Sequence, residues 1–214
     1  MKKLFFTGAI LLTSVLSFAQ RDPKAKAILD QVSAKFKTYT SLVANFSYQI
    51  TNAAGKVMAT KKGTVQMKGS KYAIDLGGNK IMSDGVTVWN YDPSAKEVTV
   101  NSANASENTI SPQKLFTDFY NKDFKYVLDK DSKVGGRDVN KIVMQPLDRN
   151  KPIERLYIAI DKATKNIIST TVIEKSGNRY VYSLSNFKPN SSIADGVFSF
   201  DKAKYPGVEV VDLR

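Results

Sequence analysis

Apolar positions are spaced as in a helix near the start of the chain and as in strands over most of the rest. Ile28, Leu29, Val32 and Phe36 recur at helical intervals, with polar residues between them. An aspartate and a proline just before this pattern supply an N-cap and a residue suited to the first helical position. The spacing predicts one amphipathic helix over residues 23–37.

After residue 40 the apolar period becomes two, which is the period of a strand with one apolar face. Phe46, Tyr48 and Ile50, for example, alternate with polar residues. Turns rich in glycine, aspartate and asparagine separate the alternating segments. Strands are predicted at residues 44–50, 57–68, 72–76, 80–82, 86–91, 97–101, 125–128, 140–144, 154–160, 167–174 and 179–187, with a brief last strand at 198–200.

A second, shorter helix interrupts the run of strands. It is predicted to begin at Ser111 and Pro112, with Leu115, Phe116 and Phe119 as its apolar stripe. About eleven consecutive strands at this spacing are typical of a meander or barrel. Together the elements predict a mainly β (α+β) domain in which helices lie against one side of a curved antiparallel sheet.

The first nineteen residues have the pattern of a secretory signal. Lys2 and Lys3 precede an uncharged, mostly apolar run over residues 4–18, and Ser17 and Ala19 place small side chains at a cleavage site. The alternative is a membrane anchor, but the run is shorter than the ~20 apolar residues that span a bilayer. We expect a signal peptide at residues 1–19 and one soluble domain at residues 20–214.

The composition excludes most common classes of catalytic site. The chain has neither histidine nor cysteine, which excludes histidine-based triads, thiol nucleophiles and the commonest zinc sites. Asp129 and Asp131 suggest a calcium loop, but they lack the ligand series and glycine of an EF-hand. The sequence therefore predicts a protein that is not an enzyme and that binds no metal or cofactor.

The net charge of +12 favours anionic partners such as membrane surfaces and acidic proteins. The lysines are scattered and no nucleic-acid-binding motif occurs, so nucleic acid is not an expected partner. The 11 Phe and 10 Tyr suffice to line a cavity or simply to fill a core. A cavity would suit acyl chains, because each CH₂ removed from water contributes about 0.8 kcal/mol.

Four blocks of the sequence together match the signature of one protein family. Residues 80–100 read KIMSDGVTVWNYDPSAKEVTV, with the S-D-G turn, the single Trp and the Y-D-P turn of the family signature. Residues 42–47 resemble its first strand, residues 111–116 its T-P-x-x-L helix, and residues 198–212 its closing F-x-F and P-x-G-V segments. The blocks occur in the family's order over most of the chain, and the sequence therefore resembles the LolA family of lipoprotein carriers.

The resemblance implies an unclosed β-barrel whose helices lid a hydrophobic cavity. It implies a periplasmic monomer of a Gram-negative bacterium that takes acylated lipoproteins from an inner-membrane ABC transporter to the outer membrane, through a LolB-like receptor where one is present. No cysteine follows the apolar run, which favours the soluble carrier over the anchored receptor. The alternatives are a carrier of free lipid or glycolipid precursors and a lipoprotein-sensing module of the same fold.

Candidate cavity residues come from the apolar positions of the first five strands. The alternation does not say which face of each strand turns inward, because a shift of one residue reverses the assignment. The helix from residue 111 supplies the candidate lid residues Leu115, Phe116 and Phe119. The predicted cavity residues are Phe46, Tyr48, Ile50, Val65, Met67, Tyr72, Ile74, Trp89 and Tyr91.

The chain departs from the family pattern beside the strand at residues 65–67. Many members carry an arginine there that helps to latch the lid, whereas the nearest cation here is Lys68. A lysine makes a less directional contact than an arginine. The family's following F-x-W becomes Tyr72-Ala73-Ile74, which replaces an aromatic wall residue by Ile74.

Overall fold

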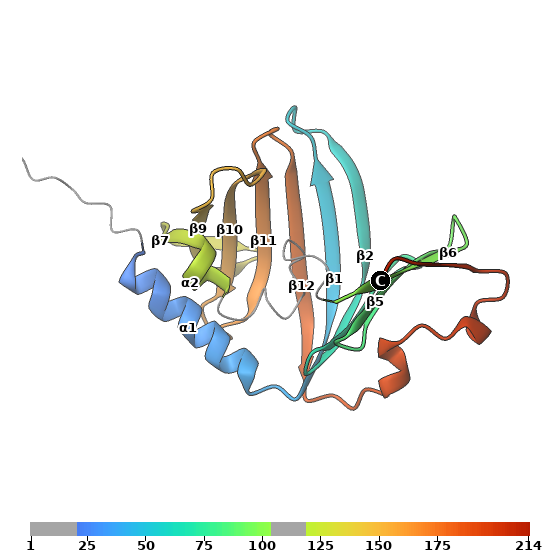
Figure 1. Cartoon of the computed structure of the whole chain (residues 1–214). Coiled ribbons are helices and arrows are strands. Elements are labelled where there is room, and N and C mark those ends of the chain that lie inside the picture. The colour runs from blue at the N-terminus through green and yellow to red at the C-terminus, as the bar shows by residue number, and fades with distance from the viewer. Residues whose placement is uncertain (1–20, 104–118) are drawn as a thin grey trace, which may run out of the picture.

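The computed structural model describes residues 21–103 and 119–214. Within them one large sheet carries two α-helices and two 3₁₀ turns (Figure 1). The elements in chain order are α1 (Pro23–Lys37), β1 (Ser41–Thr51), β2 (Val57–Lys68), β3 (Lys71–Leu76), β4 (Asn79–Ser83), β5 (Thr87–Asp92), β6 (Glu97–Ser102), α2 (Phe119–Asp123), β7 (Phe124–Leu128), β8 (Ser132–Val134), β9 (Arg137–Pro146), β10 (Ile153–Asp161), β11 (Ile167–Glu174), β12 (Arg179–Pro189), η2 (Asp195–Phe198), η3 (Lys202–Lys204) and β13 (Glu209–Asp212).

The sheet is mainly antiparallel and does not close on itself. Its strand order is β13-β6-β5-β4-β3-β2-β1-β12-β11-β10-β9-β7, and β8 pairs with β9. Among the strands within the described residues, β13 alone pairs in parallel, against β6. Strand β1 lies at the centre, because β2 and β12 both pair with it along most of its length. The predicted mainly β, unclosed architecture is confirmed.

Two details of the predicted strand list are wrong. The sheet has thirteen strands rather than about eleven, because β8 and β13 are short strands that the alternation did not indicate. Residues 198–200, predicted as a strand, do not pair: Phe198 is the last residue of η2, and the two residues after it are outside any strand. Their apolar alternation has another cause: Phe198 is buried and Phe200 partly buried in a cluster with sheet side chains.

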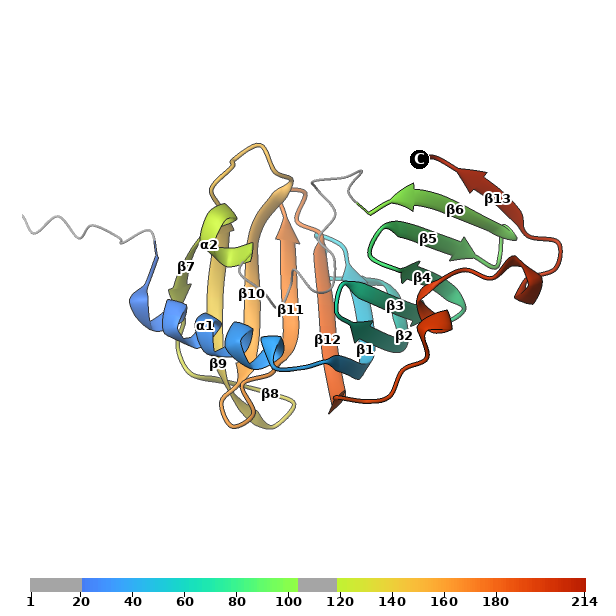
Figure 2. The same ribbon diagram turned by 60° about the horizontal axis from the view of Figure 1, so that its bottom comes forward.

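Helix α1 begins and ends where the sequence predicts, and both of its ends are tied to the sheet. The N-cap Asp22 accepts hydrogen bonds from the backbone N–H of Lys24 at 2.8 Å and of Leu128, in β7, at 3.0 Å. Near the other end, Lys35 donates to the side-chain oxygen of Asn166 at 2.9 Å and to the carbonyl of Thr164. The helix therefore spans from β7 to the turn between β10 and β11 (Figure 2).

The two faces of the sheet carry separate cores. On one face, which we call the α1 face, Ala25, Leu29 and Val32 of the helix pack against the sheet. On the opposite face, which we call the C-terminal face, residues 193–200 pack against β3 and β4. Figure 2 shows the same division, with α1 across β7–β11 and the C-terminal segment beside β3–β6.

A close approach of β2 and β3 requires a glycine. A Cβ atom on Gly63 would lie 1.6 Å from the carbonyl oxygen of Asp75, which no real contact allows. Gly63 is also directly opposite Phe46 on β1. The absence of a side chain thus permits both the β2–β3 approach and an aromatic residue on the neighbouring strand.

Candidate functional site

Strand register decides which predicted cavity residues meet. Directly opposed residues of antiparallel neighbours point to the same face, and Val65 is opposed by Ala44 on one side and Ile74 on the other. Seven of the nine predicted residues share the α1 face by this rule. They are Phe46, Tyr48, Ile50, Val65, Met67, Tyr72 and Ile74.

On the α1 face, the side chains of β1 become less buried from the start of the strand toward its end. Leu42 and Ala44 are each 1% exposed, whereas Phe46, Tyr48 and Ile50 are half-buried. Their partners on β12 are half-buried as well, and the three opposed pairs form what we call the central stripe. The central stripe consists of Phe46–Leu184, Tyr48–Tyr182 and Ile50–Tyr180.

Aromatic rings order the central stripe. The ring of Tyr182 stacks on Tyr48 with centroids 5.2 Å apart and on Phe46 at 6.2 Å, and Tyr48 stacks on Tyr180 at 6.3 Å. Burial, helped by the neighbouring tyrosines, raises the pKa of Tyr182 to about 12. Burial also raises the pKa of Tyr48. Tyr48 and Tyr182 are therefore uncharged at any physiological pH.

The other residues on the α1 face divide by burial. Val65, Met67 and Tyr72 are at most 7% exposed and belong to the packed core. Ile74 is only partly buried against that core. In this conformation Val65, Met67 and Tyr72 pack within the core, while Ile74 adds apolar surface between β2 and β4. Their role as cavity lining stays a prediction.

Trp89 and Tyr91 lie on the C-terminal face and do not meet the other seven. Trp89 is opposed by Met82, and both pack in the cluster that contains Ile193 and Phe198. Tyr91 contacts the ring of Tyr205 at a centroid distance of 4.7 Å. The single Trp of the family-like block thus faces the C-terminal segment.

A cleft of about 450 Å³ lies on the C-terminal face, between β2–β4 and the segment that contains η2 and η3. Its wall is mixed in character: Met82 and Ala73 are apolar, while Lys80 forms a 3.2 Å ion pair with Asp75. The aromatic ring of Tyr205 closes one side. Its polar half makes it less suited to acyl chains than the central stripe.

Lys68 also points to the C-terminal segment. Its ammonium is 3.0 Å from the carboxylate of Asp195 in η2 and 3.5 Å from the carbonyl oxygen of Ile193. Lys71 reaches the same carboxylate at 3.4 Å. Together these lysines hold the pKa of Asp195 below its usual value. The described contact of Lys68 is therefore with η2, and its role as a latch for the lid stays a prediction.

The predicted lid falls largely outside the described residues. Leu115 and Phe116 lie outside the described residues, as does the predicted start of the helix at Ser111 and Pro112. Of the predicted stripe, only Phe119 falls within a described element, at the start of α2. Tyr120 of α2 donates a 2.8 Å hydrogen bond to Asp30, which joins α2 to α1.

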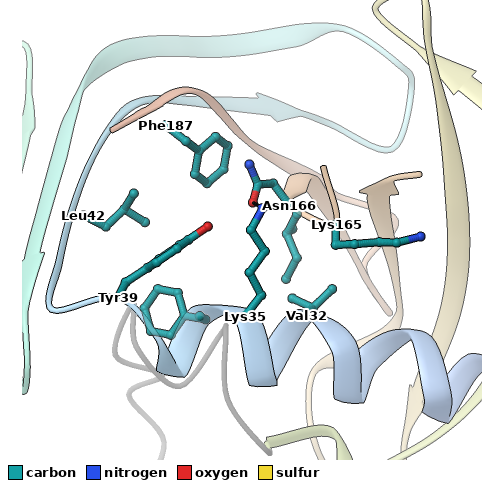
Figure 3. A pocket seen from close by; sticks show the side chains of 9 residues that line it. Val32, Lys35, Tyr39, Leu42, Lys165, Asn166 and Phe187 are labelled. Carbon is teal, nitrogen blue, oxygen red and sulfur yellow. Dashed lines mark hydrogen bonds between the residues drawn. The ribbon is translucent and has the colours of Figure 1, made fainter. Parts of the chain in front are cut away.

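A small pocket of about 10 Å³ lies where the C-terminal end of α1 meets the sheet (Figure 3). Val32, Tyr39, Leu42 and Phe187 line it, and Lys35 crosses it toward Asn166. It has about the volume that one water molecule needs. The helix and the sheet are therefore closely packed at this point, and acyl chains would need α1 to move before they could pass here.

Two specific features are absent from the described residues, namely a metal-ligand cluster and a membrane-spanning helix. Across residues 21–103 and 119–214, no three carboxylates come together in a way that would hold a metal ion. In the same ranges no helix combines the length and the apolar character needed to cross a bilayer. Asp129 and Asp131, the calcium candidates, instead pair with Lys141 at 3.1 Å and Lys162 at 2.7 Å.

Three stripe residues, Tyr180, Tyr182 and Leu184, were not among the predicted cavity residues. Their alternation along residues 179–187 was visible, but it gives only a strand. The pairing of β12 with β1 joins segments about 130 residues apart in the sequence, and local patterns do not encode such a contact. Knowledge of the strand order would have identified them.

Comparison with known families gives one match over most of the chain. The family model described as "Outer membrane lipoprotein carrier protein LolA" matches residues 37–201. An outer-membrane lipoprotein carrier protein of Glaesserella parasuis is 30% identical over 211 residues, which cover 94% of this chain and 91% of that protein. Another, from Histophilus somni, is 28% identical over 223 residues and covers 100% of this chain and 99% of the relative.

Solved structures of low sequence identity share the fold. An uncharacterized conserved protein from Thermus thermophilus superposes with a TM-score of 0.60 at 13% identity, covering 88% of this chain and 99% of that chain. The lipoprotein LppX of Mycobacterium tuberculosis superposes with a TM-score of 0.54 at 14% identity, covering 81% and 98%. At these identities the likeness concerns the fold alone.

Proposed function

Because the chain belongs to the LolA family of outer-membrane lipoprotein carrier proteins, we propose that it binds the acyl chains of lipoproteins along the central stripe. The family consists of carriers and not of enzymes. The observation that carries the proposal is the stripe itself: three opposed pairs of large apolar or aromatic residues, half-buried, at the centre of an unclosed sheet.

The chemistry of the stripe suits acyl chains. Each CH₂ that leaves water for this surface contributes about 0.8 kcal/mol, so a few dozen methylenes give ample affinity. The contacts are non-directional, and Tyr182 remains uncharged because burial raises its pKa to about 12. A surface of this kind holds chains of differing length and releases them when another apolar site competes.

Transport between membranes completes the proposal. Residues 1–19 act as a signal peptide that is removed, and residues 20–214 act as one carrier domain in the periplasm. An inner-membrane ABC transporter loads the carrier, and an outer-membrane receptor of the LolB kind unloads it where one is present. Leu115, Phe116 and Phe119 act as the lid over the acyl chains.

A release assay tests the proposal. Spheroplasts of the source bacterium are incubated with the purified protein, and the soluble fraction is probed for lipoproteins in complex with it. We expect acylated lipoprotein in a one-to-one complex. Leu184→Glu should reduce release at least tenfold, because it places a charge in the central stripe.

Val181→Glu is the matched control, because Val181 lies on the same strand, is half-buried and points to the opposite face. It should release lipoprotein as the native protein does. Equal loss in both variants would contradict the role of the stripe. Free lipid in the purified protein, without any acylated peptide, would instead identify a carrier of free lipids.

A further inference from the structure

One end of the sheet exposes apolar side chains on neighbouring turns. Val57 and Met58, at the start of β2, are 50% and 59% exposed, and Leu147, just after β9, is 44% exposed. Single exposed apolar residues are common on protein surfaces. These three, however, lie on turns that the strand register places at the same end of the sheet.

The register shows which turns share that end. Thr51 pairs with Arg179, and Arg179 pairs with Ile173, so the β1–β2 and β11–β12 turns are neighbours. Lys175 donates hydrogen bonds to the carbonyls of Arg149 and Pro152, which joins the β9–β10 turn to the same row. Figure 1 shows the three turns along the upper side of the sheet.

We call residues 52–58, 147–152 and 175–179 the basic rim. Within these ranges the only carboxylate is Asp148, and the five cations are Lys56, Arg149, Lys151, Lys175 and Arg179. One further carboxylate, that of Glu174, adjoins the rim and accepts a hydrogen bond from Ser176. The part of the chain that the structure describes offers no ion-pair partner to any of these five. The basic rim therefore combines unpaired positive charge with exposed apolar side chains.

The opposite end of the sheet is different, although it is also rich in cations. There Lys162 pairs with Asp131 at 2.7 Å and Arg137 lies 3.7 Å from Asp161. Lys133 lies 3.6 Å from Asp138. Three cations at that end are thus compensated, whereas Lys130, Lys165 and Lys188 there, like the cations of the basic rim, have no ion-pair partner among the described residues.

We propose that the basic rim docks on the anionic surface of a lipid bilayer. Cations near such a surface are attracted to its anionic headgroups, and apolar side chains between them enter the boundary between headgroups and acyl chains. The net charge of +12 adds long-range attraction. An anionic bilayer suits both the cations and the exposed Val57, Met58 and Leu147 along one edge.

Docking at the basic rim would place a bilayer next to the central stripe, and the role of this docking rests on the proposed function. The central stripe ends at the pair Ile50–Tyr180, and the next pair along the strands, Thr51–Arg179, belongs to the turns. Acyl chains that leave a bilayer at the basic rim would meet the stripe directly. Docking would thus spare the chains a passage through water.

Flotation with lipid vesicles tests the proposal. Protein purified from the periplasm of an expressing bacterium is mixed with phosphatidylcholine vesicles, with or without phosphatidylglycerol, and no lipoprotein is present. We expect binding to the anionic vesicles that weakens as salt screens the charges. Replacing Lys56, Lys151 and Arg179 by glutamate should weaken it about tenfold or more, because each cation contributes separately.

The matched control reverses three cations away from the basic rim, namely Lys130, Lys188 and Lys202, which are exposed. Both triple variants have the same net charge, so equal loss of binding would overturn the proposal in favour of general electrostatic attraction. Val57→Ser with Met58→Ser should weaken binding at least fivefold, and Val86→Ser, 72% exposed on another turn, should not.

Absence of binding by the native protein at low salt would overturn the proposal and leave the basic rim as a surface for an acidic protein. The result is separable from the proposed function. Leu184→Glu should keep vesicle binding while it loses lipoprotein release. A protein that releases lipoprotein but does not bind vesicles would retain the carrier function and lose the docking site.

Discussion

The rings of Tyr48 and Tyr182 stack across the central pair of strands, with their centroids 5.2 Å apart and their planes at 29°. The two residues are 134 positions apart in the sequence and directly opposed in the register of β1 and β12. Their contact joins the N-terminal and C-terminal halves of the sheet at its centre. It also places two phenol groups on an apolar surface.

The first prediction concerns the alkaline titration of this pair. Burial raises the pKa of Tyr182 to about 12, whereas an unfolded tyrosine titrates near pH ~10. Folding therefore favours the neutral phenol of Tyr182. The stabilisation that this phenol contributes is complete below pH ~10 and is lost as pH rises toward about 12. Tyrosinate absorbance should show a late step that Tyr182→Phe removes.

Tyr205→Phe, on the opposite face, should leave the late step in place. Loss of the step in that variant would show that the most perturbed tyrosine is not the one in the central stripe.

A second prediction concerns the N-cap of α1. Asp22→Ala removes the acceptor for the N–H of Lys24 and leaves the N–H of Leu128 without its carboxylate partner. Loss of a helix N-cap alone costs about 0.5–2 kcal/mol, so we expect a decrease in the free energy of unfolding toward the upper end of that range. Urea denaturation measures it. Asp22→Asn keeps a capping oxygen and should lose less; an equal loss would mean that charge rather than capping matters.

A third prediction follows from the carboxylates that the fold stabilises in charged form. A hydrogen bond from the backbone of Leu128 lowers the pKa of Asp22, and a hydrogen bond from Lys26 lowers that of Asp30. The backbone N–H of Thr164 lowers the pKa of Asp161. The pKa values of these carboxyls are lower in the folded state than in the unfolded state, so the charged carboxylates stabilise the fold at pH values above the unfolded pKa. This stabilisation is lost as pH falls through the folded-state pKa values.

Thermal unfolding as a function of pH should therefore show a steep loss of stability below pH ~4. Between pH ~5 and ~7 the melting temperature should change little, because the sequence has no histidine or cysteine. In Asp161→Asn, the melting temperature should fall less steeply as the pH is lowered. A transition centred near pH ~6.5, where a histidine would titrate, would contradict this account of the titrating groups.

The fourth prediction tests the close approach of β2 and β3. In Gly63→Ala the new Cβ would meet the carbonyl oxygen of Asp75, which is backbone and cannot rotate away. Overpacking of this kind costs about 1–3 kcal/mol or more, so the melting temperature should fall by several degrees. Gly196→Ala is the matched control, because no atom lies within 4 Å of its Cβ position. Similar melting temperatures for both variants would show that the strands separate easily.

Local signals predicted helix α1 and most strands well. Asp22 and Pro23 mark the start of the helix because capping and a fixed φ angle act within one turn. Alternation likewise identified the strands that carry Phe46 and Tyr72. These features depend on neighbours in the sequence, so the sequence alone contains them.

The division of the site between two faces was not predictable in the same way. Trp89 and Phe46 both follow an alternating pattern, yet they lie on opposite faces. Period two defines a face for each strand, but the choice of side depends on what covers it. Here the cover is α1 on one side and the segment with Phe198 on the other, and neither contact is local.

The unclosed sheet has free edges, and the edge at β7 is covered by the chain itself. Arg21 forms a parallel bridge with Tyr126, the N–H of Asp22 bonds to the Tyr126 carbonyl at 3.0 Å, and the Asp22 carboxylate accepts from Leu128. Exposed strand edges template aggregation between molecules. At this edge the chain's own N-terminal segment therefore occupies positions that a strand of another molecule would need for self-assembly, and the residue that caps the helix is part of that cover.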